Sequence, residues 1–305
     1  MSAALEIQHG LGVSSGSTVF SGARVLEGPD ALRRISVAGR VRRAGDWQIW
    51  ESGERFFAVA AVRVGGRRLA AATFRLYRQL FEAVSGRMVY RIWHFVPAIN
   101  SMESGLENYR AFCLGRHAAF QHFSIGGHPA ASAVGSAGDE LVAWCLAGPP
   151  PVRPLENPLQ IPAYHYPVAY GPRPPRFSRA VVTRDEIFVS GTSSIRGHET
   201  VARRDTATQL AVTLDNMQAV LAQANLDWRA LAHAGSSATV YLRRAADLPS
   251  VRRALQQAWG TAEKQTLYLQ ADICRIELDI EIECRLALNP TDRQRTGPRT
   301  ARRPR

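Results

Sequence analysis

Residues 180–190 read AVVTRDEIFVS, and this stretch opens the segment whose pattern decides the fold. Two apolar runs, 180–183 and 186–190, flank Arg184-Asp185, which predicts a β-hairpin. The elements predicted after the hairpin are a helix at 205–224, a strand at 238–242, a helix at 249–259, and strands at 266–273 and 277–286. The order ββαβαββ indicates an α+β unit with its helices packed on one face of a sheet.

The first half of the chain can be read in the same order, although no residue-level repeat is visible. Its predicted elements are strands at 35–41, 47–50 and 55–64, a helix at 68–84, a strand at 88–96, a helix at 104–120 and a strand at 140–146. Proline is dense at 148–176, where it interrupts helices and central strands. We therefore predict an N-terminal domain (1–150), a proline-rich bridge (151–178), a C-terminal domain (179–288) and a basic disordered tail (289–305).

Composition favours a globular cytoplasmic protein. The 305 residues are 46% apolar, which can supply real cores, and the N-terminus does not resemble a secretory signal. Four irregularly spaced cysteines are expected to be free thiols. The net charge is +12, and six arginines lie between Arg293 and Arg305. A solvated tail is the ordinary explanation of that run, and a nucleic-acid-binding protein is the alternative from another class.

Several polar groups could form a site. Tyr109 and Arg116 lie seven residues apart on one helix and could clamp a carboxylate, or Tyr109 could be core while Arg116 reaches solvent. Tyrosines and arginines alternate at 164–179, a pattern suited to a small aromatic acid or to a single-stranded nucleic acid. Alternation places Glu281 in a line of acids on a strand face, which is usually solvated. No histidine pair has ligand spacing, so we expect no metal.

Four groups of residues, between about 90 and 286, together resemble the chorismatase family. They are RIWHFVPAIN (91–100) with GLENYRAFCLGRHAAF (105–120), YHYPVAYGPRPPRFSRA (164–180), IFVSGTSSIRGHET (187–200) and YLQADICRIELDIEIE (268–283). The resemblance implies two packed units similar to the RidA (YjgF) fold, in agreement with the ββαβαβ order read from the residues. It also implies a lyase that acts on chorismate without a cofactor.

The resemblance implies a role for each site residue. Glu281 would be catalytic and would protonate the enolpyruvyl methylene of chorismate, so its pKa should be raised by burial. Cys274 would mark the branch that aromatises the ring, giving pyruvate with 3-hydroxybenzoate and, in similar pigment-associated members, 4-hydroxybenzoate as well. The residues implied to bind substrate are Tyr109, Arg116, Arg179, Tyr164, Tyr170, Ser193, Gln270 and Arg275.

Two departures from the family bear on these roles. Leu159 stands where a basic residue often follows Asn-Pro, and Ser193 occupies a position where small residues differ between branches. The alternatives within enzymes are hydrolysis of chorismate to a dihydroxycyclohexadiene carboxylate and a RidA-like imine deaminase. We expect no nucleic-acid or membrane partner, favour a monomer, and predict a role in pigment or ubiquinone biosynthesis.

Overall fold

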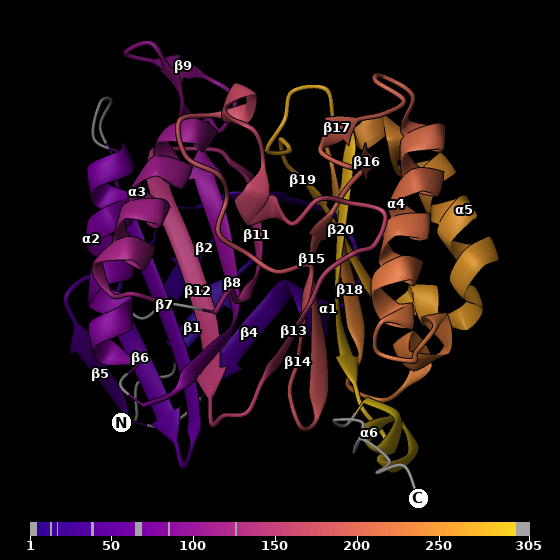
Figure 1. Cartoon of the computed structure of the whole chain (residues 1–305), viewed down its shortest axis with the longest axis horizontal. Coiled ribbons are helices and arrows are strands. Elements are labelled where there is room, and N and C mark those ends of the chain that lie inside the picture. Colours follow the sequence, from indigo (N-terminus) through magenta and orange to yellow (C-terminus); the bar gives the residue numbers. More distant parts are fainter. Residues whose placement is uncertain are drawn as a thin grey trace, which may run out of the picture.

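The computed structural model describes residues 5–12, 14–16, 18–37, 40–64, 69–84, 86–125 and 127–296. Two large β-sheets face each other, and each carries its two long helices on the outer face (Figure 1). Helices α2 (Leu69–Ala83) and α3 (Asn108–His122) cover one sheet, and α4 (Thr206–Ala222) and α5 (Leu248–Trp259) cover the other. The predicted α+β class with two alike units, helices on one face of each sheet, is confirmed.

Both sheets have the same strand order. Written from the first strand of each unit, the first sheet runs β5-β6-β7-β12-β8-β11 and the second runs β13-β14-β15-β20-β18-β19, with β3 added at its edge. The last strand of each unit, β12 or β20, therefore lies at the centre of its sheet. The strands of the first unit are β5 (Val41–Ala44), β6 (Trp47–Ser52), β7 (Arg55–Arg63), β8 (Met88–Pro97), β11 (Ala130–Ser136) and β12 (Glu140–Gly148). Those of the second are β13 (Arg153–Leu155), β14 (Ala180–Val182), β15 (Glu186–Thr192), β18 (Ser237–Leu242), β19 (Thr266–Gln270) and β20 (Ile280–Ala287).

The alternation of side chains along the central strands explains the four layers of the protein, which are a helix pair, two sheets and a second helix pair. On β7, Phe56 and Ala58 pack against α2 and α3, whereas Phe57 and Val59 join the cluster between the two sheets. Both faces of β7 are therefore buried, and its sequence is almost continuously apolar. On β20, the apolar side chains face the second pair of helices, and they are Ile280, Ile282, Cys284 and Leu286. Glu281 and Glu283 alternate with them and therefore point toward the first sheet.

The N-terminal segment connects the two units. Strands β1 (Leu5–Gln8), β2 (Thr18–Phe20) and β4 (Arg34–Val37) form a separate small sheet, with the short helix α1 (Asp30–Arg33) before β4. Strand β3 (Arg24–Glu27) pairs with β19 and extends the second sheet. Part of the first 150 residues thus belongs structurally to the second unit, because the free edge of β19 offers backbone groups that β3 satisfies.

Other elements differ from the expectation. Residues 102–107 form β9 (Met102–Glu103) and β10 (Leu106–Glu107), so α3 begins later than predicted. The hairpin of β16 (Ile195–Arg196) and β17 (Glu199–Thr200) was also not predicted. The tail expected to be disordered instead forms α6 (Pro290–Thr296), where Asp292 and Thr296 are buried and Arg153 Nη2 donates to the Thr296 carbonyl at 3.0 Å. Residues 297–305 lie outside the described residues.

Candidate active site

A cavity of about 380 Å³ is lined by residues from both units. The start of α3, the proline-rich bridge, the end of β15 and the loop before β20 all contribute to its wall. The charged and sulfur-bearing residues of the lining are Glu107, Arg110, Arg179, Arg203, Cys274, Arg275, Glu277 and Glu281, and the tyrosines are Tyr109, Tyr166 and Tyr170. A cavity of this size suits a small molecule.

Glu281 is the buried acid of the cavity. It is 4% exposed, because alternation along β20 points its side chain between the two sheets rather than into solvent. The pKa of Glu281 is raised to about 8, chiefly by burial and also by the nearby Glu283 carboxylate, while Arg91 opposes the change. Its Oε1 has no hydrogen-bond partner among the described residues, and its Oε2 accepts a long 3.5 Å contact from Ser193 Oγ. At neutral pH most molecules therefore carry a protonated acid here.

Two guanidinium groups face the cavity with unused donors. Arg179 is 3% exposed, and its Nη2 donates to the Ile161 carbonyl at 3.1 Å and to the Tyr166 hydroxyl at 2.8 Å. Arg275 Nη1 donates to the His198 carbonyl at 2.8 Å, and its guanidinium lies 4.1 Å from the ring centre of Tyr170. In the described part of the chain, Arg179 Nε and Arg275 Nη2 are buried without a partner. Such donors are expected to bind an anionic ligand.

The other two arginines of the cavity are neutralised by glutamates. Arg110 pairs with Glu107 at 3.2 Å, and Arg203 lies 3.7 Å from Glu277. Neither Arg179 nor Arg275 forms an ion pair with any carboxylate in the described ranges. With Glu281 protonated, the cavity therefore presents two guanidiniums that form no ion pair within the described residues, which matches a ligand with two carboxylates.

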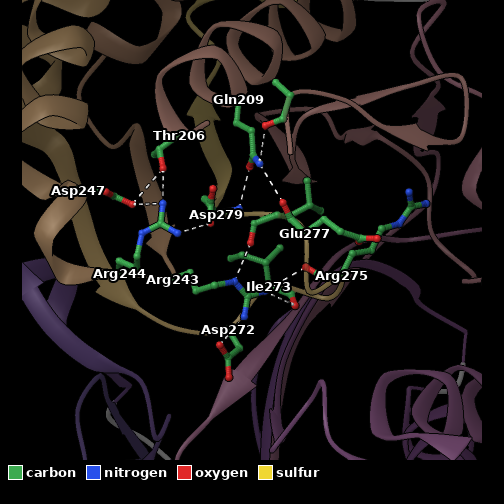
Figure 2. A network of polar contacts seen from close by, with 12 residues as sticks. Thr206, Gln209, Arg243, Arg244, Asp247, Asp272, Ile273, Arg275, Glu277 and Asp279 are labelled. Atoms are coloured by element: carbon green, nitrogen blue, oxygen red, sulfur yellow. Dashed lines mark hydrogen bonds and ion pairs between the residues drawn. The ribbon is translucent and has the colours of Figure 1, made fainter. Parts of the chain in front are cut away.

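The loop between β19 and β20 carries Cys274 and Arg275, and Arg243 holds this loop in place. Figure 2 shows the Arg243 guanidinium among the carbonyls of the loop. Its Nη1 also donates to the Asp272 carboxylate at 2.6 Å. The carbonyls that accept from it, at 2.8 to 3.2 Å, belong to Ile273, Arg275 and Leu278. A planar fork with five N–H groups can satisfy several carbonyls at once, whereas an ammonium cannot match that geometry.

The thiol of Cys274 is held in its neutral form. The pKa of Cys274 is raised to about 12, chiefly by burial, and ionisation of Glu281 at higher pH acts in the same direction. The neighbouring Tyr109 hydroxyl also has its pKa raised well above the usual range, chiefly by burial. Both groups are therefore proton-bearing at neutral pH. The four cysteines are free, as expected.

Seven of the ten predicted site residues meet at the cavity, namely Tyr109, Arg179, Tyr170, Ser193, Cys274, Arg275 and Glu281. The other three do not line it. Arg116 is 2% exposed and points into the first core, with its guanidinium 5.3 Å from the Tyr77 ring, so it reaches neither the cavity nor solvent. The Tyr164 ring packs against His128 at a tilt of 43°, with ring centres 4.2 Å apart, and Gln270 Nε2 makes a long 3.4 Å contact to the Arg243 carbonyl.

Three further residues line the cavity although the sequence did not single them out as site residues, namely Arg110, Arg203 and Tyr166. Arg110 is next to Tyr109 and shares the first turn of α3, which was a usable signal. Arg203 gave no signal, because it comes to the cavity only through the turn that follows β17. Leu159, one of the departures noted above, is 41% exposed and does not line the cavity.

Two further observations concern ligands and membranes. The described residues contain no group of three or more histidine, cysteine, aspartate or glutamate side chains placed to hold a metal ion. Among the same residues, no helix combines the length and the apolar character needed to cross a bilayer.

Both halves of the chain are similar to known protein families. A family model described as chorismatase FkbO/Hyg5-like, N-terminal, matches residues 35–147, and one described as endoribonuclease L-PSP matches residues 172–287. A 3-hydroxybenzoate synthase of Streptomyces hygroscopicus is 37% identical over 251 residues, which is 76% of this chain and 73% of that protein. A chorismatase of Streptomyces rapamycinicus is 37% identical over 74% of this chain and 73% of its own. A crystal structure of a chorismatase superimposes with a TM-score of 0.78 at 31% identity and covers 92% of both chains.

Proposed function

This chain belongs to the chorismatase family, and from that premise we propose that it cleaves chorismate into pyruvate and 3-hydroxybenzoate. One observation carries the proposal. Arg179 Nε, Arg275 Nη2 and Glu281 Oε1 are buried and unpartnered in the described chain, and their side chains line one cavity. Chorismate has a ring carboxylate, an enolpyruvyl carboxylate and an enol ether that must be protonated, so it supplies a partner for each group.

The two free guanidiniums bind and orient the substrate. Each can form two parallel hydrogen bonds with a carboxylate. Tyr170 supports Arg275 by stacking at 4.1 Å, and Tyr166 fixes Arg179 through its hydroxyl. The enolpyruvyl group is thereby held against Glu281, since fixing the reactants in position lowers the entropic barrier.

Glu281 then acts as the general acid. Its proton passes to the methylene carbon of the enol ether, which creates an oxocarbenium centre and leaves a carboxylate beside it. The carboxylate stabilises that positive charge in a site shielded from water. When the ether bond at ring C3 breaks, the ether oxygen leaves with its electron pair as the ketone oxygen of pyruvate. The oxygen of the 4-hydroxyl attacks C3 and then separates from C4. Aromatisation removes the proton of C3 and leaves the hydroxyl on C3, as in 3-hydroxybenzoate, so the ring loses one proton in all and Glu281 can regain the one that it donated. Pyruvate and a hydroxybenzoate together contain the same atoms as chorismate, and no water or oxidant is consumed.

Cys274 serves as a proton carrier in this proposal. A thiol whose pKa is raised to about 12 is almost wholly protonated at neutral pH, which disfavours attack by a thiolate. A neutral S–H beside the ring can relay the proton that aromatisation releases. A lyase reaction is therefore our assignment, and hydrolysis to the dihydroxycyclohexadiene carboxylate is the alternative in which a water molecule attacks instead. A cytoplasmic monomer remains our prediction.

The test is to incubate the purified protein with chorismate alone and to resolve the products by chromatography beside a coupled pyruvate assay. We expect pyruvate with 3-hydroxybenzoate, with or without the 4-isomer. Formation of a dihydrodiol acid would support cleavage of chorismate but would assign hydrolysis, rather than aromatisation, to this protein. Absence of pyruvate, or faster hydrolysis of 2-iminobutyrate than of chorismate, would overturn the proposal.

The matched variant is Glu281→Gln, which keeps the size of the side chain and removes its acid. We expect no pyruvate release, while the affinity for chorismate measured by calorimetry stays within a few-fold of that of the unmodified protein. Turnover by this variant at a near-normal rate would remove Glu281 from the mechanism.

A further inference from the structure

A buried ion pair lies at the contact between the two sheets, next to the cavity but outside its lining. Arg91 on β8 donates through Nη2 to Glu283 Oε2 on β20, and their side chains are 1% and 7% exposed. The indole Nε1 of Trp93 donates to Glu283 Oε1 at 2.7 Å. Ser132 on β11 accepts from Arg91 Nη2 and donates to Glu283 Oε2. With three donors, Glu283 is satisfied as a carboxylate.

The same network touches the catalytic acid. Glu281 and Glu283 are two residues apart on β20, so both point toward the first sheet. The Gly191 N–H donates to Ser132 Oγ at 3.0 Å. A Cβ at Gly191 would lie 2.0 Å from Glu281 Oε1 and 2.9 Å from Ser132 Oγ, so the two oxygens are close neighbours. Only a residue without a side chain allows the Glu281 carboxyl to stand there.

The groups around Glu281 come from every element packed against it. Glu283 is on the same strand, Arg91 lies across the sheet contact on β8, and Arg179 precedes β14. Tyr241 on β18 is the cross-strand neighbour of Glu281, and its pKa is raised well above the usual range, chiefly by burial. Cys274 in the loop is likewise a neutral acid, and Ser193 has no charge. The fixed charges near Glu281 are therefore one carboxylate and two guanidiniums.

These charges act in opposite directions. The negative charge of Glu283 disfavours a second carboxylate beside it, whereas the positive charges of Arg91 and Arg179 favour one. Because Arg91 and Trp93 belong to the first unit and Glu283 to the second, the balance exists only where the two sheets meet. A single unit of this fold would leave Glu283 without its cation.

We propose that the Arg91–Glu283 pair is a positioning device that fixes a carboxylate and a guanidinium beside the Glu281 carboxyl and thereby sets how firmly Glu281 holds its proton between turnovers. This inference rests on the proposed role of Glu281 as the general acid. Neither member of the pair lines the cavity, so neither is expected to touch the substrate. The pair acts through Glu281 alone, and it gives the first unit a part in the acid chemistry in addition to its share of the cavity wall.

The test is the pH dependence of kcat/KM for chorismate in the unmodified protein, in Glu283→Gln and in Arg91→Met. Glu283→Gln removes the like charge and leaves Arg91 unpaired, so the alkaline limb should move to lower pH by at least about one unit. Arg91→Met leaves two neighbouring carboxyls, and the last proton shared by them should leave at higher pH, which moves the limb upward. Arg91→Lys keeps the charge and should restore the position of the limb.

Opposite shifts are what distinguish this role from a merely structural one, because loss of packing would lower activity without moving the limb in two directions. Limbs that coincide with that of the unmodified protein, or that move the same way in both variants, would overturn the proposal. If the variants do not fold, carboxyl-labelled glutamate NMR of the unmodified protein serves, with Glu281→Gln used for assignment. We expect Glu281 to be protonated at neutral pH, and an ionised Glu281 would overturn the inference.

The two failures can be told apart. Turnover that survives in Glu281→Gln would refute the proposed function, whatever the NMR titration shows. If Glu281→Gln is inactive but the alkaline limb of kcat/KM does not shift in the Arg91 and Glu283 variants, only the role of the pair is refuted.

Discussion

Replacing Glu281 with glutamine should make the protein more stable while it destroys the proposed activity. The folded chain holds this carboxyl in its protonated form to about pH 8, whereas the unfolded chain releases the proton near its ordinary value of 4.5. Between those two values the folded state binds more protons than the unfolded state, so the free energy of unfolding falls as pH rises. Glutamine is neutral throughout and escapes this loss.

The magnitude follows from the same two values. A tenfold difference in proton affinity is worth about 1.4 kcal/mol, so the interval from 4.5 to about 8 corresponds to about 5 kcal/mol at or above pH 8. Below about pH 5 the difference is under about 1 kcal/mol, because both states are then largely protonated. Water entry and local rearrangement reduce such costs, and we expect a gain of at least about 2 kcal/mol at pH 8.

The assay is equilibrium urea unfolding of both proteins at about pH 5 and about pH 8, where the sign of the effect can be read directly. Glu54→Gln is the matched control, because Glu54 is exposed in the turn between β6 and β7 and should change stability little at either pH. If Glu281→Gln were equally stable or less stable than the unmodified protein at pH 8, the buried protonated acid would be refuted.

Three other predictions concern the loop that carries Cys274 and the C-terminal residues of the chain. Cys274→Ala should change the ratio of hydroxybenzoate isomers to dihydrodiol rather than abolish pyruvate release, because the thiol carries a proton after the acid step. Arg243→Met should lower kcat and disturb the same product ratio, since three carbonyls of the loop that bears Cys274 lose their donor. Removing residues 297–305 should leave chorismate turnover unchanged, whereas a cut before Pro290 should also cost about 1–2 kcal/mol of stability by deleting α6.

Product chromatography, steady-state kinetics and thermal unfolding check these expectations. An unaltered product profile in Cys274→Ala would return that residue to a packing role. Full activity of Arg243→Met would show that the loop between β19 and β20 keeps its conformation without the Arg243 guanidinium. Loss of turnover on removal of 297–305 would assign the basic tail a part in the reaction, and a lost affinity for nucleic acid with a smaller salt slope would revive the alternative of another class.

Local pattern was enough for the elements whose periodicity is strong. The hairpin at 180–190, the long helices and the last strand were predicted within a few residues, because period and turn chemistry are local properties. The strand β11 was missed, since its sequence AASAVGS is small and weakly patterned, and its place is set by parallel pairing with β8. Pairing with β19 likewise decided that β3 joins the second sheet.

The sequence by itself determined the family, the α+β class and the face of β20 on which Glu281 stands. It did not determine whether that face is exposed to solvent or buried, and the ordinary expectation of a solvated line of acids is wrong for Glu281. A strand's alternation assigns residues to two faces, but only the second sheet decides which face loses its water. That loss of water is what holds the proton on Glu281.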